Sequence, residues 1–310
     1  MAPKPVVLIG AAKAGTTSLA QALCMHPEIA ELAIKEPGYY CTDVRTSDFS
    51  QDYRKLLSFD ETRYFNSSAL TPRHIAFVSL KENYTRLITE AIEACPNARY
   101  YLDASTAYLY SQTAAAQLHA AEPEAKIIAV LRNPVSRAYS HYNMARKYGL
   151  ERRSALEAFS QESKLERARW GIDECYLELG NYSEQLQPYL ELFDRSQLLL
   201  LFHEDLKARP DEVLQHVADF LGLPAFVHSV PENENKAAIP KSGAAAVFAS
   251  AFKGGIRDKI PSGMKRFGKR ILFSEPDSLD KDARTVLVRY FAAEIQRLEE
   301  LLEIDLSHWK

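Results

Sequence analysis

The chain has 310 residues, of which 46% are hydrophobic and 25% charged, so it can bury a full core and has the composition of a soluble globular protein. Its formal net charge is −3, which does not indicate long-range steering toward nucleic acid or another polyanion. Any basic binding surface must therefore be local.

The N-terminal segment runs from a short apolar strand, Val6–Ile9, through a turn rich in glycine and threonine into a helix expected over Thr17–Met25. Such a turn places backbone N–H groups around a phosphate. In a nucleoside-triphosphate loop a lysine follows the second glycine, whereas here Thr16 follows Gly15 and Lys13 lies inside the loop. The sequence therefore predicts a phosphate-binding loop that is not of the usual triphosphate kind.

The next strand is expected over Ile29–Ile34, and the tripeptide Lys35-Glu36-Pro37 follows it. Because a proline disfavours helical backbone at the residue before it, we expect Glu36 to be extended at the end of this strand and to project into a cleft. The residues alone leave two roles open for Glu36. It is either a general base or a solvated carboxylate paired with Lys35.

Two further strands are expected over Tyr100–Asp103 and Ile127–Leu131, after a helix over Tyr84–Ala94. The run Ile127–Leu131 is continuously apolar, as expected of a strand covered on both faces in a parallel sheet. Arg132 follows directly where this strand ends. Because ligands of open α/β sheets collect at the carboxyl ends of strands, its planar guanidinium is well placed to bind a phosphate dianion.

A helix expected over Ser136–Lys147 follows, with Asn133 as its cap, Pro134 at its first position and Ser140 about two turns in. Taken singly, Arg132 and Ser140 are also explained by a surface salt bridge and a solvated hydroxyl. Two phosphate-binding corners in one chain, however, suit one ligand that carries two separate phosphate groups.

The rest of the chain continues the alternation of strands and helices, without an internal repeat. Right-handed parallel βαβ crossovers are the economical interpretation, so the sequence predicts an α/β fold. The last helix has apolar residues at helical spacing, which indicates either core packing or the face of a homodimer. The remaining elements are a strand over Leu198–Phe202 and helices over Ala155–Ala168, Ser183–Leu192, Asp211–Leu221 and Leu287–Leu302.

The first loop resembles the 5′-phosphosulfate loop of sulfotransferases, and the segment Arg132–Ser140 resembles their 3′-phosphate site. These enzymes use 3′-phosphoadenosine 5′-phosphosulfate (PAPS) as donor. The resemblance spans most of residues 5–242. It implies a P-loop-like parallel sheet flanked by helices in a single domain over residues 1–310, with a C-terminal basic segment and helices at 243–310. It also implies a set of donor-binding residues: Lys13, Ala14, Gly15, Thr16, Thr17, Ser18, Arg132, Ser140, Tyr182, Lys241 and Ser242.

Within this set, the resemblance places Tyr182 near the adenine and the Lys241-Ser242 loop over the 3′-phosphate. Simple core packing of Tyr182 and a solvated Lys241 are the alternatives. A second basic stretch, Lys253–Arg270, is either a flap that helps to hold an anion or an exposed basic loop and helix.

The segment from Lys35 through Tyr40 resembles the one that carries the general-base glutamate in carbohydrate and many bacterial sulfotransferases. The resemblance implies that Glu36 accepts the acceptor's proton, that Lys13 stabilises the leaving phosphate, and that no metal takes part. One departure concerns a lysine that several carbohydrate sulfotransferases carry beside the acceptor. The matching stretch, Asp103–Tyr108, has alanine there.

The function expected from the resemblance is sulfuryl transfer to a hydroxyl or amine of a carbohydrate or small metabolite. A P-loop kinase or nucleotidase is a rival, but the displaced lysine and the lack of an aspartate at the end of Ile127–Leu131 argue against it. A non-catalytic nucleotide-binding protein is the other alternative. The four scattered cysteines, and the short apolar run before Gly10, predict a cytoplasmic protein without a membrane anchor.

Overall fold

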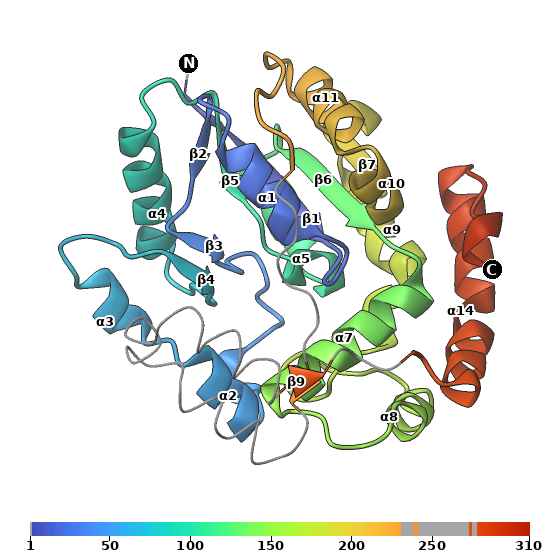
Figure 1. Ribbon diagram of the computed structural model, residues 1–310. Helices are drawn as coiled ribbons and strands as arrows, with labels where there is room; N and C mark the ends of the chain where they lie inside the picture. The colour runs from blue at the N-terminus through green and yellow to red at the C-terminus, as the bar shows by residue number, and fades with distance from the viewer. Residues whose placement is uncertain (1, 231–238, 241–272, 275–277) are drawn as a thin grey trace.

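The computed structural model describes residues 2–230, 239–240, 273–274 and 278–310. Its centre is a sheet in the order β2-β5-β1-β6-β7, in which all neighbouring strands are parallel (Figure 1). The predicted α/β fold with a parallel central sheet flanked by helices is therefore confirmed. The strands are β1 (Lys4–Gly10), β2 (Ile29–Glu31), β5 (Tyr100–Asp103), β6 (Lys126–Leu131) and β7 (Leu198–Phe202).

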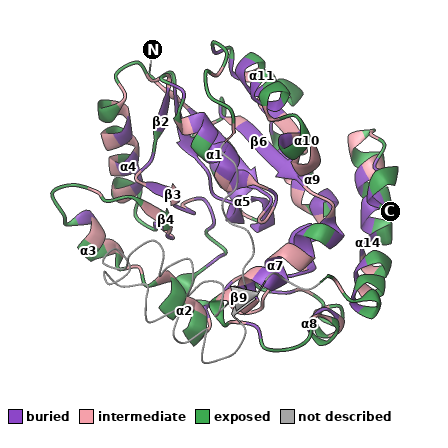
Figure 2. Cartoon of the chain, viewed as in Figure 1, coloured by how far each residue is buried: buried purple, intermediate pink, exposed green. Residues whose placement is uncertain are grey.

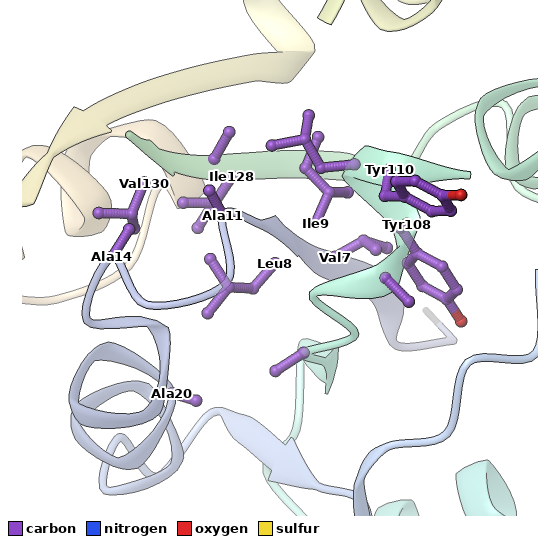
Figure 3. Close-up of a cluster of buried hydrophobic side chains, with 14 of the residues drawn as sticks. Val7, Leu8, Ile9, Ala11, Ala14, Ala20, Tyr108, Tyr110, Ile128 and Val130 are labelled. Atoms are coloured by element: carbon purple, nitrogen blue, oxygen red, sulfur yellow. The ribbon is translucent and has the colours of Figure 1, made fainter. Parts of the chain in front are cut away.

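The middle of this sheet is buried because apolar side chains cover both of its faces (Figure 2). Successive side chains of β1 point to opposite faces. Figure 3 shows Leu8 on the side of Ala20 in α1 (Thr16–Cys24) and Val7 on the side of Tyr108 in α5 (Ala107–Tyr110). A continuous apolar run is thus the pattern that a strand between two helices requires.

The single strand expected over Ile29–Ile34 is wrong, because the structure divides it in two. After β2 the chain leaves the central sheet, and β3 (Ile34–Glu36) pairs in parallel with β4 (Arg73–Ile75) in a separate two-stranded sheet. The Arg73 amide donates to the Ala33 carbonyl at 2.8 Å and fixes this second pairing. Glu36 is therefore extended, as predicted, but it belongs to β3.

Most of the expected helices lie within a few residues of their predicted bounds. They are α1, α4 (Lys81–Ala94), α7 (Pro134–Tyr148), α9 (Tyr182–Leu192) and α11 (Pro210–Leu221).

Two helices differ more. The helix α8 (Ala155–Glu162) ends well before Ala168, where the Glu162 carboxylate accepts backbone N–H groups of the following loop, including those of Tyr176 and Leu177. The last helix, α14 (Lys281–Leu302), begins earlier than expected, because Asp280 caps it by accepting the Ala283 amide.

Among the described residues, five short α-helices were not expected, because a stretch of four to eight residues is too short to show a helical period. Two of them lie between β3 and β4, and their first turns are capped by Ser50 and Asp60. The five are α2 (Gln51–Leu57), α3 (Glu61–Phe65), α5, α6 (Ala114–Ala121) and α10 (His203–Ala208).

The apolar face of α14 packs within this chain, against α7, α8 and α9. Its buried residues include Leu287, Phe291 and Ile295. Phe291 packs closely against Gly180, just before α9, because a Cβ atom at Gly180 would lie only 2.6 Å from the Phe291 ring. Of the two roles predicted for this helix, core packing is confirmed, and a homodimer stays a prediction.

The described residues form one α/β domain. The expected division into a core over 5–242 and a C-terminal part over 243–310 stays a prediction, and Lys241, Ser242 and the basic stretch Lys253–Arg270 lie outside the described residues. None of the helices in the described part of the chain is long and apolar enough to cross a membrane. The cellular location stays a prediction.

Candidate active site

The two predicted phosphate corners lie at one edge of the sheet. Because β1 and β6 are parallel neighbours, their carboxyl ends meet there (Figure 1). The Ala11 amide donates to the Val130 carbonyl at 2.7 Å, which ties the first loop to β6. Arg132 Nη1 donates to the Lys13 carbonyl oxygen at 2.9 Å. The structure therefore brings both corners together and joins them directly.

The first loop turns sharply, with φ of 71° at Lys13 and 95° at Gly15, both in the left-handed region. A side chain at Gly15 would also come within 3.0 Å of His203 Nδ1. That same nitrogen lies 3.0 Å from the Ala14 carbonyl oxygen. Because the C=O and N–H of a trans peptide point in opposite directions, the Gly15 amide points away from His203.

The start of α1 has the properties of an anion site. Its cap, Gly15, has no side chain to accept the first amides, and the first turn carries no acidic residue. The first four N–H groups of a helix have no partner inside it, and the helix dipole places partial positive charge there. Thr16 and Ser18 are buried beside these amides and Thr17 is half-buried. The segment from Ala14 to Ser18 can therefore bind a phosphate.

Lys13 carries its ammonium from the first loop toward α7, where Nζ lies 3.4 Å from Met144 Sδ. Burial, together with the nearby cations Arg132 and Lys147, lowers the pKa of Lys13 to about 8, whereas Glu36 acts in the opposite direction. A partly desolvated cation beside other cations is stabilised by a bound anion.

Arg132 is held in place through its own backbone. Its carbonyl oxygen accepts the Tyr182 hydroxyl at 3.0 Å, and the next amide, that of Asn133, donates to Glu204 Oε1 at 3.2 Å. Burial lowers the pKa of the Arg132 guanidinium from its ordinary value. Asn133 caps α7 as predicted, by accepting the Ser136 amide at 3.1 Å.

Ser140 is half-buried on α7, one turn beyond Ser136. Arg137, which lies between them, is fully buried and its Nη2 donates to the Tyr176 carbonyl. Of these two residues Ser140 is therefore the more accessible, and its contact with a phosphate stays a prediction.

Tyr182 lies in the core behind Arg132. The residue is 0% exposed, its ring packs edge-on against Trp309 with centroids 6.4 Å apart, and its hydroxyl is engaged by Arg132. This burial favours the core-packing alternative, in which the Tyr182 hydroxyl holds the Arg132 backbone. Contact of Tyr182 with the adenine stays a prediction.

Glu36 lies buried at the end of β3, with hydrogen-bond donors around its carboxylate. Oε1 accepts from Lys35 Nζ at 2.7 Å, Oε2 accepts from Thr106 Oγ1 at 2.7 Å, and His74 Nε2 lies 3.9 Å from Oε1. Burial by itself would raise the pKa of this carboxyl, but the Lys35 charge and the hydrogen bonds from Lys35 and Thr106 outweigh burial and lower it. Glu36 is therefore ionised at neutral pH.

A buried carboxylate fixes the segment after Glu36. Asp103 is fully buried and accepts hydrogen bonds from Ser105 Oγ at 2.6 Å, Tyr108 Oη at 2.7 Å and Tyr84 Oη at 2.9 Å. Ser105 Oγ in turn accepts the Gly38 amide at 3.0 Å. Burial raises the pKa of Asp103 to about 6 in spite of these bonds. Asp103 is thus a structural anchor, because its three hydrogen-bond donors are buried side chains.

This chain matches a family model described as "Sulfotransferase domain" over residues 3–239. The chain belongs to the sulfotransferase family. It is accordingly an enzyme, and the rival assignment to P-loop kinases or nucleotidases does not stand.

Two relatives and one solved structure show the range of similarity. The bifunctional heparan sulfate N-deacetylase/N-sulfotransferase 1 of Xenopus tropicalis is 27% identical over 308 residues, which are 96% of this chain and 29% of that protein. The heparan sulfate glucosamine 3-O-sulfotransferase 3A1 of Mus musculus is 25% identical over 223 residues, 71% of this chain and 46% of that one. The chain thus spans less than half the length of these relatives.

The crystal structure of a sulfotransferase from Alicyclobacillus acidocaldarius superposes with a TM-score of 0.70 and 24% identity, covering 100% of this chain and 99% of that one. At this level of identity the likeness concerns the fold. It agrees with the parallel sheet and flanking helices of this sulfotransferase.

Three residues of this sulfotransferase site were not expected from the sequence: Thr106, His74 and His203. Thr106 stands in the turn after β5, and His203 follows β7 at the same sheet edge as Arg132, so position after a strand was an available signal. His74 had no such signal, because β4 has three residues and pairs with a distant strand. In the described part of the chain no cluster of His, Cys, Asp or Glu could hold a metal ion.

The hydrogen bond from the Gly38 amide to Ser105 gives the first test. Replacing Ser105 by alanine leaves the Gly38 amide and one oxygen of Asp103 without this partner. We expect the free energy of unfolding to fall by about 1 to 3 kcal/mol, measured by urea denaturation. The control is Ser68→Ala at an exposed site, with a change below about 0.5 kcal/mol. An effect of Ser105→Ala as small as that of the control would contradict the anchoring role.

Proposed function

We propose that this sulfotransferase moves the sulfuryl group of PAPS to a hydroxyl or amine of a carbohydrate or small metabolite, with Glu36 as the general base. The observation that carries this proposal is the pair of anion-binding corners at one sheet edge, joined by the bond from Arg132 to Lys13. A donor with two separate phosphate groups matches two such corners better than a nucleotide with one phosphate chain.

The 5′ end of the donor belongs at the start of α1. The amides of Gly15 to Ser18, the hydroxyls of Thr16, Thr17 and Ser18, and the Lys13 ammonium are the groups that would bind it there. The Ala14 amide donates to the Ala11 carbonyl, and Ala14 stays a predicted contact. The 3′-phosphate belongs beside the Arg132 guanidinium and the Ser140 hydroxyl, which offer a planar fork and a neutral donor. Lys241 and Ser242 stay predicted contacts of the same phosphate.

In the proposed reaction the acceptor oxygen or nitrogen forms a bond to sulfur while the bond from sulfur to the bridging 5′-phosphate oxygen breaks. The acceptor's proton passes to the Glu36 carboxylate, and the bonding electron pair stays on the leaving phosphate oxygen. Lys13 stabilises that developing charge. The protein's contribution is mostly in-line positioning and electrostatic stabilisation, as in phosphoryl transfer.

A carbohydrate acceptor is supported by the two relatives above, whose names state heparan sulfate as their substrate. Both O- and N-sulfotransferases are among them, so hydroxyl and amine acceptors stay equally proposed. Turnover of labelled PAPS with a pool of sugar and metabolite acceptors tests the proposed reaction. No transfer to any acceptor by a protein that binds the nucleotide would contradict it.

Arg132 gives a test of the donor assignment. Lysine in its place keeps the charge but loses the planar fork that suits a phosphate. We expect Arg132→Lys to weaken binding of adenosine 3′,5′-bisphosphate about tenfold or more, measured by titration calorimetry. Binding of adenosine 5′-monophosphate, which depends on Arg132 only through its bond to the Lys13 carbonyl, should weaken clearly less.

The matched control is Arg209→Lys, at an exposed arginine paired with Asp205 on the surface, which should alter neither affinity. An equal loss of affinity for the two nucleotides would show that Arg132 does not bind the 3′-phosphate.

Glu36 gives a test of the chemistry. Glutamine keeps the size of the side chain and can accept hydrogen bonds, but it cannot take the proton. We expect Glu36→Gln to lower kcat by about a hundredfold or more, while affinity for adenosine 3′,5′-bisphosphate stays within about twofold. Labelled-donor assays and calorimetry measure the two quantities.

Glu31→Gln, at the exposed end of β2, is the control and should keep full activity. Substantial turnover by Glu36→Gln would remove Glu36 from the role of base.

A further inference from the structure

The two oxygens of the Glu36 carboxylate have different surroundings. Oε2 accepts two hydrogen bonds from Thr106, from Oγ1 at 2.7 Å and from the backbone amide at 3.3 Å. Oε1 accepts one, from Lys35 Nζ at 2.7 Å. Since a carboxylate oxygen has two lone pairs, Oε2 is saturated and Oε1 retains one free lone pair.

The exposed neighbour of Glu36, His74, lies on the side of Oε1. His74 Nε2 is 3.9 Å from Oε1, which is too far for a hydrogen bond. The His74 side chain is 64% exposed, whereas those of Lys35 and Glu36 are 15% and 10% exposed. An acceptor that approaches Glu36 past His74 would therefore meet Oε1, since Thr106 occupies the other oxygen.

We propose that Oε1 is the atom of Glu36 that receives the acceptor's proton, and that Lys35 is the positioning residue that holds this oxygen in place. This inference rests on the proposed role of Glu36 as base. The acceptor's proton moves to the free lone pair of Oε1 as the bond to sulfur forms and the bond to the phosphate oxygen breaks. Lys35 remains bound to the same oxygen on its other lone pair.

Lys35 also keeps Glu36 ionised. The charged and titratable groups that face Glu36 are Lys35 on its own strand, His74 on β4, Lys13 on the first loop and Asp103 at the end of β5. Burial and the Lys35 charge lower the pKa of His74, so its ring is neutral at pH 7. The cations near Glu36 at that pH are therefore Lys35 and Lys13, and Lys35 is the one in direct contact.

The Lys35–Glu36 pair differs from a surface ion pair of the same length. Lys4 and Glu124 are also 2.7 Å apart, but their side chains are 41% and 74% exposed. Exposed pairs are screened by water and salt and contribute little, whereas a pair with both members mostly buried is screened less. Removing the charge of Lys35 should therefore raise the pKa of Glu36. Removing the charge of Lys4, which pairs with Glu124, should not change it.

The experiment is the pH dependence of kcat/KM for the acceptor in Lys35→Met. Without the cation the acid limb, which reports protonation of Glu36, should move upward by about one pH unit. On the alkaline plateau kcat should fall about tenfold, because Oε1 is no longer held. Affinity for adenosine 3′,5′-bisphosphate should stay within about twofold. Lys35→Arg should restore the acid limb of the wild type, and the control Lys4→Met should leave the profile unchanged.

Lys35→Gln, which is neutral but polar, replaces Lys35→Met if the latter fails to fold, and the same upward shift is expected. An acid limb and plateau equal to those of the wild type, or equal profiles for Lys35→Met and Lys35→Arg, would overturn the inference. An inactive Glu36→Gln together with an unchanged Lys35→Met refutes only the role of Lys35. An active Glu36→Gln refutes the proposed base itself.

Discussion

The hydrogen bond from Arg132 Nη1 to the Lys13 carbonyl oxygen is the contact on which the candidate site depends. It spans two adjacent parallel strands, so it can form only if β1 and β6 end at the same level of the sheet. The Ala14 amide of the same peptide donates to the Ala11 carbonyl at 3.1 Å, so both sides of the Lys13–Ala14 peptide are held. One arginine thereby both offers a cationic fork and fixes the loop that binds the other anion.

A layer of buried contacts holds these two corners and the proposed base. Tyr182 and Glu204 bind the backbone on either side of the Arg132–Asn133 peptide, and His203 lies against the Ala14 carbonyl. On the other side of β1, Asp103 holds the segment after Glu36 through Ser105. The polar groups that would face the ligand are therefore supported by side chains that the ligand does not touch, which is how a site is preorganised.

The sequence predicted the parts of this arrangement that depend on local pattern. Continuous apolar runs located β1 and β6, the residues after them located the two corners, and Pro37 correctly indicated extended backbone at Glu36. It could not predict the pairing of β3 with β4, because both strands are three residues long and far apart in the chain. Whether the ring of Tyr182 faces a ligand or the core depends on tertiary packing, which no local pattern reports.

A crystal structure of the complex with adenosine 3′,5′-bisphosphate is the most direct test that both corners bind one ligand. The expected result has the 5′-phosphate on the amides at the start of α1 beside Lys13, and the 3′-phosphate on the Arg132 guanidinium and the Ser140 hydroxyl. Electron density for the nucleotide away from this sheet edge, or a 3′-phosphate that does not contact Arg132, would contradict it.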